Sequence, residues 1–131
     1  MQHPPATAGL RHVALHVQDL DAAERFYVAL LGMQVEWRPD ADNVYLTSGT
    51  DNLALHRSDR ETDRSAQALD HIGFVLKTAD DVDAWYEFLL ANGVEMKSTP
   101  RTHRDGARSF YCTGPQQVTI QMIYHPPIAG R

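Results

Sequence analysis

The sequence predicts an α+β fold of two repeated β-α-β-β-β modules, whose curved mixed sheets enclose a cavity and whose helices lie outside. An internal repeat is the first observation that supports it. Shifting the chain by 59 residues aligns residues 10–36 with residues 69–95 and gives eight identities in 27 positions, where unrelated sequences would share about one or two. We therefore expect two half-domains, made by duplication, within one domain of residues 10–124.

The second observation is that each repeat begins with a two-faced strand. The stretches LRHVALHV and LDHIGFVL start the two copies, and side chains in a strand alternate between its faces. Aliphatic side chains therefore share one face of each strand, while His12 and His71 lie on the other face beside Ala14 and Gly73. Small neighbours around a polar side chain leave room for a ligand.

Length and composition limit the classes of function. The chain of 131 residues has a net charge of −5 and an isoelectric point near 5.7, which argues against nucleic acid or an anionic membrane as a partner and favours a small molecule. The single Cys112 excludes an intrachain disulfide and fits a reducing cytoplasm. No apolar run approaches 18 residues and no leader is evident, so we expect neither a transmembrane helix nor a signal peptide.

The first module is expected to occupy residues 10–57, after a flexible lead-in of residues 1–9. After its first strand, Asp21 and Glu24 have the spacing of a capping box and predict a helix of about 11 residues that ends at Gly32. Three short strands follow, separated by turn residues. Their expected bounds are residues 33–38, 43–47 and 52–57.

The second module is expected to occupy residues 69–124, after a charged linker of residues 58–68 and before a tail of residues 125–131. Thr78 or Asp80 is the expected cap of its helix, which Asn92 and Gly93 end. The helix should run from about residue 80 to 91, with strands near 69–77, 94–98, 107–112 and 117–124. Its expected buried stripe consists of Val82, Trp85, Tyr86, Leu89 and Leu90.

Four polar side chains occupy the first and last strands of the two modules: His12, His56, His71 and Gln121. If the halves pair, these side chains can converge in one cavity. Neutral imidazoles are common ligands of divalent first-row metals, and an amide oxygen is a weaker, uncharged ligand. We therefore expect one divalent ion, Fe, Ni, Zn or Mn, with positions left open for substrate oxygen.

The loop before the penultimate strand carries Arg101, Arg104 and Arg108 around His103. It is interpreted either as a solvated turn or as an anion clamp, in which His103, Arg104 and Arg108 bind a carboxylate or phosphate of the substrate. Tyr45 is a further candidate for substrate binding, together with Trp37, although core packing explains Trp37 equally well.

The repeated plan, the histidine near the start of each half and the stretch SFYCTGPQQVTIQM at residues 109–122 resemble the vicinal-oxygen-chelate superfamily. That superfamily includes glyoxalase I, extradiol catechol dioxygenases, epimerases and the bleomycin- and fosfomycin-resistance proteins. The resemblance covers residues 10–124 and implies a metal, held at His12, His56, His71 and Gln121, that chelates two adjacent substrate oxygens. It also implies a homodimer, since small two-module members often pair and exposed sheet edges favour pairing.

Three functions remain open under this resemblance. A glyoxalase-like lyase or isomerase fits four ligands, but Gln121 replaces the usual glutamate and an amide cannot accept a proton near neutral pH. An extradiol-type dioxygenase would use the two first-strand histidines and Tyr111, ten residues before Gln121, as the group that hydrogen-bonds a substrate oxygen. In either enzyme Tyr111 and Gln121 are the candidate catalytic residues. The third function is drug binding without catalysis, which needs no metal.

Overall fold

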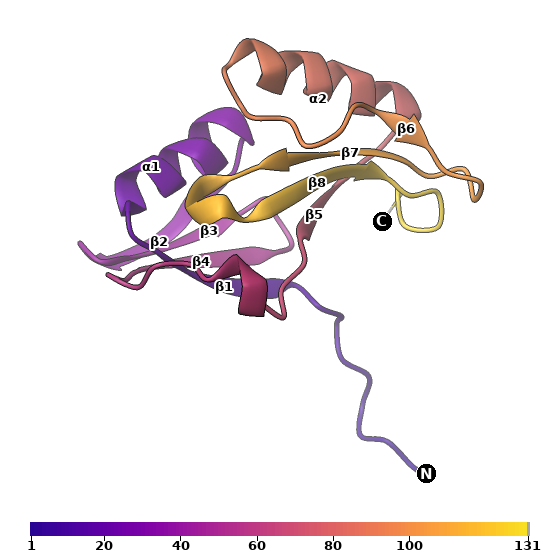
Figure 1. Ribbon diagram of the computed structural model, residues 1–131. Coiled ribbons are helices and arrows are strands. Elements are labelled where there is room, and N and C mark those ends of the chain that lie inside the picture. Colours follow the sequence, from indigo (N-terminus) through magenta and orange to yellow (C-terminus); the bar gives the residue numbers. More distant parts are fainter. Residues whose placement is uncertain (131) are drawn as a thin grey trace. The chain divides into compact units, whose positions relative to one another are not determined.

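The computed structural model describes residues 1–130, apart from the side chain of Arg64, and divides into two compact units, Met1–Glu61 and Thr62–Arg131. Residue 131, the end of the expected tail, lies outside the described part. Each unit contains one four-stranded mixed sheet and one main helix that covers one face of that sheet (Figure 1). The predicted α+β fold of two β-α-β-β-β modules is confirmed, and each sheet is open.

In the first unit the strands are arranged in the order β1-β4-β3-β2. β1 pairs with β4 in parallel, and the other two pairings are antiparallel. The alternation predicted for β1 is present, because Leu15 and Val17 are buried whereas His12 and His16 are exposed. The strand bounds are β1 His12–Val17, β2 Gln34–Asp40, β3 Asn43–Thr47 and β4 Asn52–Arg57.

The helix of the first unit, α1 (Leu20–Arg25), continues into a π-helical turn, Phe26–Leu30. Its N-cap is Asp19 rather than Asp21, because the Asp19 carboxylate accepts the backbone N–H of Ala22 at 2.9 Å. The wider turn buries both Phe26 and Tyr27. Gly32, at φ 80°, follows the helix as predicted.

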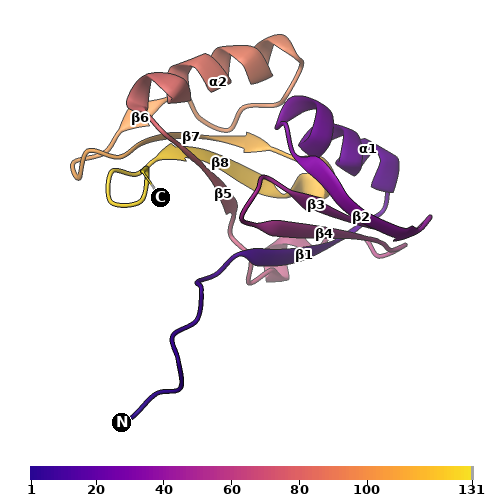
Figure 2. The same cartoon turned by 180° about the vertical axis from the view of Figure 1, so that it is seen from behind.

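The second unit repeats the sheet in the order β5-β8-β7-β6, with β5 and β8 parallel. Its helix α2 (Ala79–Ala91) starts at a capping box formed by Thr78 and Asp81 and packs on the sheet (Figure 2). Val82 and Leu89 are buried in the described chain. The strand bounds are β5 Ile72–Leu76, β6 Arg101–Thr102, β7 Arg108–Thr113 and β8 Thr119–Tyr124.

Two predictions for the second unit were wrong. Residues 94–98 form no strand, although an isolated bridge between Met96 and Cys112 and a few backbone hydrogen bonds join them to β7, so the second strand of the module is the two-residue β6. Leu90 is 48% exposed rather than part of the buried stripe, because only one side of α2 faces its sheet. No helix among the described residues is long and apolar enough to cross a membrane.

Candidate metal and substrate site

His12 is held in one orientation by a short relay of polar groups. Its Nδ1 lies 2.7 Å from Oδ1 of Asn52, and Nδ2 of Asn52 donates to a carboxylate oxygen of Glu36 at 3.0 Å. The carboxylate accepts only from the amide N–H₂ group, so the amide oxygen faces the ring and the ring proton is on Nδ1. The Nε2 lone pair of the neutral ring is therefore left for a ligand.

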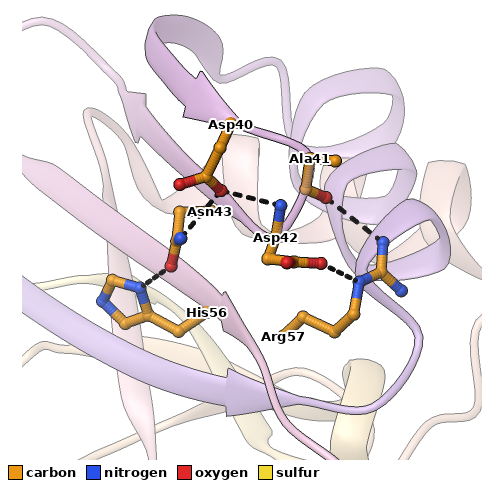
Figure 3. A network of polar contacts seen from close by, with 6 residues as sticks. All are labelled: Asp40, Ala41, Asp42, Asn43, His56 and Arg57. Carbon is orange, nitrogen blue, oxygen red and sulfur yellow. Dashed lines mark hydrogen bonds and ion pairs between the residues drawn. The ribbon is translucent and has the colours of Figure 1, made fainter.

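His56 has an equivalent relay in the same unit (Figure 3). Its Nδ1 lies 2.6 Å from Oδ1 of Asn43, whose Nδ2 donates to Asp40 at 2.8 Å. The backbone N–H of Asp42, followed by the Asn43 amide, holds the pKa of the Asp40 carboxyl below its usual value. The carboxylate thus stays ionised and fixes the amide, which in turn leaves Nε2 of His56 with its lone pair.

The structure does not bring His12 and His56 together. On the paired strands β1 and β4, Asn52 lies opposite His12 and His56 lies opposite His16. The two candidate ligands are therefore four positions apart, about 13 Å along the strands. Each ring is also held by its own asparagine, so the two histidines of the first unit do not bind one ion together in this arrangement.

The second unit places three predicted site residues side by side. Gln121 and Tyr111 are register partners on β8 and β7, and Nε2 of Gln121 donates to the Tyr111 hydroxyl at 3.1 Å. The ring of His71 contacts that of Tyr111 edge to face, with centroids 5.3 Å apart. Gln121 is 9% exposed, whereas 32% of the His71 side chain is exposed.

The hydrogen bonds of His71 and Gln121 leave one atom of each side chain able to act as a metal ligand. Nδ1 of His71 donates to the adjacent Asp70 carboxylate at 2.7 Å, which leaves its Nε2 lone pair. Because the amide nitrogen of Gln121 is engaged by Tyr111, its Oε1 is the acceptor that remains. That oxygen lies over Gly73, 3.7 Å from where a Cβ would be.

The two registers show which residues of the modules correspond. Gly73 is opposite Gln121 on β5 and β8. Its counterpart in the repeat is Ala14, which is opposite Ala54 on β1 and β4. Ala54, fully buried, therefore takes the place of Gln121 in the first unit, and His56 lies two residues beyond it, opposite His16.

The donor set fits a divalent metal in its chemistry. His12 and His71 each have a fixed tautomer with a lone pair on Nε2, and Gln121 has a directed carbonyl oxygen, as metal ligands require. Within either unit, over the residues that the structure describes, no group of three His, Cys, Asp or Glu side chains gathers as a complete metal site. The thiol of Cys112 is no alternative ligand, because burial raises its pKa to about 11.

The three residues of the expected anion clamp, His103, Arg104 and Arg108, lie in different surroundings. Arg108 is already paired, because its guanidinium donates twice to Asp83 and once to Thr102. His103 faces Oγ of Ser109 at 3.1 Å, and Arg104 is exposed. His103 and Arg104 line a surface pocket of about 520 Å³ together with Arg101, Thr102 and Asp105. Binding of a substrate anion there stays a prediction for His103 and Arg104.

Tyr45 lies between two other rings on the sheet of the first unit. It stacks on Trp37 with centroids 5.2 Å apart and meets His56 edge to face at 5.9 Å. Trp37 is 59% exposed, so core packing does not account for it.

The orienting residues Asn43, Asn52 and Asp70 are not anticipated from the sequence. Two of them could have been found in the sequence. Asp70 directly precedes His71, and Asn52 is four residues before His56 in the same strand, so their side chains point to the same face. The partnership of Asn43 with His56 depends on the pairing of β3 with β4, which the sequence alone does not align.

Comparisons with known proteins agree with this architecture. The family model described as Glyoxalase/Bleomycin resistance protein/Dioxygenase superfamily matches residues 9–122. No curated protein matches the chain. A lactoylglutathione lyase from Agrobacterium tumefaciens is a similar solved structure, with a TM-score of 0.75 and 22% identity over 92% of this chain and 96% of that one.

Two further solved structures share the fold. A glyoxalase/bleomycin resistance protein/dioxygenase from Alicyclobacillus acidocaldarius has a TM-score of 0.72 and 24% identity, covering 91% of this chain and 92% of its own. A glyoxalase-related enzyme from Fulvimarina pelagi has a TM-score of 0.72 and 16% identity, covering 92% and 90%. The match of the family model over most of the length shows that this chain belongs to the glyoxalase/bleomycin resistance protein/dioxygenase superfamily.

Proposed function

We propose that this protein is a metal-dependent enzyme that acts on a small substrate with two adjacent oxygen atoms, and that His12, His71 and Gln121 hold the metal. The observation that carries the proposal is the orientation of the two first-strand histidines. In both, an acceptor fixes the proton on Nδ1 and leaves Nε2 as a ligand. A protein that only encloses an apolar drug has no need of such relays.

Chemistry at this site depends on a divalent ion, which would supply Lewis-acid polarisation of the substrate oxygens. Tyr111 has the proton-handling role among the chain's own residues. Its hydroxyl accepts from Nε2 of Gln121, so its own proton is left for a substrate oxygen. Gln121 thus does two things, since the same amide orients Tyr111 and directs Oε1 as a ligand.

The ligand set favours an extradiol-type ring-cleaving reaction over a glyoxalase-type proton transfer. Because Ala54 occupies the position that matches Gln121, the first unit has no fourth ligand there. The proposed set is therefore two histidines and Gln121, with Tyr111 ten residues before Gln121. Glyoxalase-type proton transfer also needs a base, and Gln121 cannot accept a proton. The set departs from extradiol enzymes in having an amide where they have a carboxylate.

A lyase or isomerase is the second candidate, because a lactoylglutathione lyase is among the similar solved structures. Such a reaction would need a base other than Gln121. His56 does not supply it, because it lies about 13 Å from His12 along the strands, beyond hydrogen-bond reach of a substrate held there.

The test uses protein purified without an affinity tag and reconstituted with Fe(II), Ni(II), Zn(II) or Mn(II). Ring opening of catechol under oxygen and turnover of lactoylglutathione are followed for each metal, with His71→Ala as the matched loss-of-ligand control. We expect activity only with bound metal and none in His71→Ala. If His71→Ala binds every metal with the same affinity and in the same number as wild type, the metal proposal is wrong and the drug-binding function replaces it.

The proposal includes a homodimer with two equivalent sites. β2 is an edge strand of its sheet, all seven of its residues are exposed, and Trp37 and Val35 present apolar surface there. Exposed edges of this kind favour pairing with another chain. Analytical ultracentrifugation at micromolar concentration tests this point, and a monomer that still holds its metal would contradict it.

A further inference from the structure

The proposed metal set leaves His56 unused, although its ring is held as firmly as that of His12. The side chain next to it across the sheet is His16, its register partner on the parallel strand β1. Register partners on neighbouring strands project from the same face. Their ring centroids are 6.3 Å apart with an interplanar angle of 54°.

We propose that His16 and His56 form a second metal site, separate from His12, His71 and Gln121, that takes a divalent ion such as Zn²⁺, Ni²⁺ or Cu²⁺. Imidazole suits these three metals. The site lies wholly within the first unit and does not depend on the proposed function.

The distance between the rings suits a shared ion. Two imidazoles bound at the usual metal–nitrogen distance of about 2.0–2.1 Å have ring centres about 5–6 Å apart, depending on the angle at the metal. The observed 6.3 Å is close to the upper end. His16 is exposed, so a small rotation of its side chain closes the remaining gap while His56 stays fixed.

The surroundings of His56 match those of a metal ligand. Asp40 binds the Asn43 amide, and the amide oxygen accepts from Nδ1 of His56, so Nε2 has the lone pair (Figure 3). Such outer hydrogen bonds set the tautomer and raise the basicity of a ligating histidine. Arg57, the next residue, is directed to Asp42 and the carbonyl of Ala41, where its charge is balanced.

The pair supplies two ligands only. Among the residues that the structure describes, no third His, Cys, Asp or Glu completes a cluster with them, and Tyr45 approaches His56 with its ring edge. Water or a small anion would fill the other coordination positions. We therefore expect weaker binding than at a site with three protein ligands.

The experiment is a titration of untagged His71→Ala protein with Zn²⁺ alone, measured by isothermal calorimetry. The His71→Ala substitution disables the proposed first site. We expect about one equivalent to remain bound. Replacing His16 or His56 by alanine in that background should weaken the remaining binding by about tenfold or more, and Asn43→Ala by about tenfold through its hold on the tautomer. His125→Ala is the matched control and should change nothing.

A second readout counts the nitrogen ligands. Electron paramagnetic resonance of the Cu²⁺-loaded His71→Ala protein should show two imidazole nitrogens, falling to one in His16→Ala/His71→Ala. Circular dichroism verifies that each variant is folded, and His16→Asn replaces His16→Ala if the latter is not. The proposal is overturned if removing His16 and His56 leaves the Zn²⁺ affinity and stoichiometry of the His71→Ala protein unchanged.

The outcomes for the two sites are distinguishable. If the proposed enzyme site fails, wild type binds one Zn²⁺ that disappears with His16 or His56 and is insensitive to His71. If the second site fails, wild type binds one Zn²⁺ that disappears with His71 alone.

Discussion

The last strands of the two modules, β4 and β8, have the same pairing and different chemistry. β4 pairs in parallel with β1 and β8 with β5, each at the centre of its sheet. At the matching position β4 carries the buried methyl group of Ala54, whereas β8 carries the amide of Gln121 bound to Tyr111. The candidate ligand of β4 is His56, which lies two residues beyond Ala54 and opposite His16.

The two modules therefore share their strand pairing, while their polar side chains occupy different positions. Both first-strand histidines retained a partner at Nδ1, through an asparagine in one unit and directly from an aspartate in the other. A displacement of two residues keeps a side chain on the same face of the sheet. His56 can therefore face the same side as His12 without sharing its ion.

The comparison predicts unequal effects of two histidine substitutions on the proposed enzyme site. His71→Ala removes a first-strand ligand and should weaken metal binding by more than about 100-fold, since losing only an outer partner already costs 10–100-fold. His56→Ala should leave that site within about twofold. Calorimetry with Fe(II) or Zn²⁺ measures both affinities. Equal losses in the two variants would mean that His56 shares the first site.

Gln121→Glu should raise the affinity of the proposed site for the metal. A carboxylate adds a charged ligand, and the hydrogen bond with Tyr111 reverses because the hydroxyl must then donate, so we expect metal affinity to rise by about tenfold or more. The same change at the matching place in the other module, Ala54→Glu, would supply a fourth ligand. Unchanged affinity in Gln121→Glu would place the amide outside the ligand shell.

The two orienting devices can be compared by removing each one. Asn52→Ala frees Nδ1 of His12, and Asp70→Ala frees Nδ1 of His71. Each should lower metal affinity by about 10- to 100-fold with the ligands themselves intact. Asn52→Asp is a partial control, because a carboxylate can accept from Nδ1 as the amide oxygen does but cannot donate to Glu36. Full affinity in both alanine variants would refute the role of the relays.

The smallest expected effect is on stability. It concerns the ion pair between Arg108 on β7 and Asp83 on α2, which is not part of the proposed metal site. The hydrogen bond from Arg108 holds the pKa of the Asp83 carboxyl below its usual value. The folded chain therefore binds this proton less readily than the unfolded chain, so the stabilisation is complete above about pH 4 and is lost as the pH falls.

Arg108→Met tests that ion pair. It should lower the melting temperature by at most about 4 °C at pH 7, because both partners are partly exposed. The difference from wild type should shrink below about pH 4, and metal affinity should not change. An equal difference in melting temperature at pH 3 and pH 7 would contradict the assignment.

The sequence predicts most of the fold because the repeat and the strand alternation are local patterns. Strands 43–47 and 52–57 agree with β3 and β4, and Thr78 caps α2 as expected. The predicted strand 94–98 is wrong because an alternation of apolar residues does not show whether a neighbouring strand pairs with the whole segment. Only Met96 forms a β-bridge to β7. The cap at Asp19 was missed because Asp19 and Asp21 offer similar carboxylates within two residues.

The candidate site is predicted less completely than the fold, since it depends on register. Sequence alone places His56 and Gln121 in corresponding strands, but only the pairing of β1 with β4 shows that Ala54 is the matching residue. The relays through Asn43 and Asn52 likewise join residues on different strands. The pairing of Arg108 with Asp83 connects β7 to α2 and removes a cation from the expected anion clamp.

The most direct test of the proposed enzyme site is anomalous diffraction from crystals grown with Zn²⁺ or Co²⁺ at neutral pH. We predict an anomalous peak with Nε2 of His12 and His71 at about 2.0–2.1 Å and Oε1 of Gln121 at about 2.0–2.2 Å, distinct from the second peak expected at His16 and His56. His56 should be absent from that ligand shell. A peak bound by His56 in place of Gln121, or no peak at His71 in fully metal-loaded crystals, would show that the proposed ligand set is wrong.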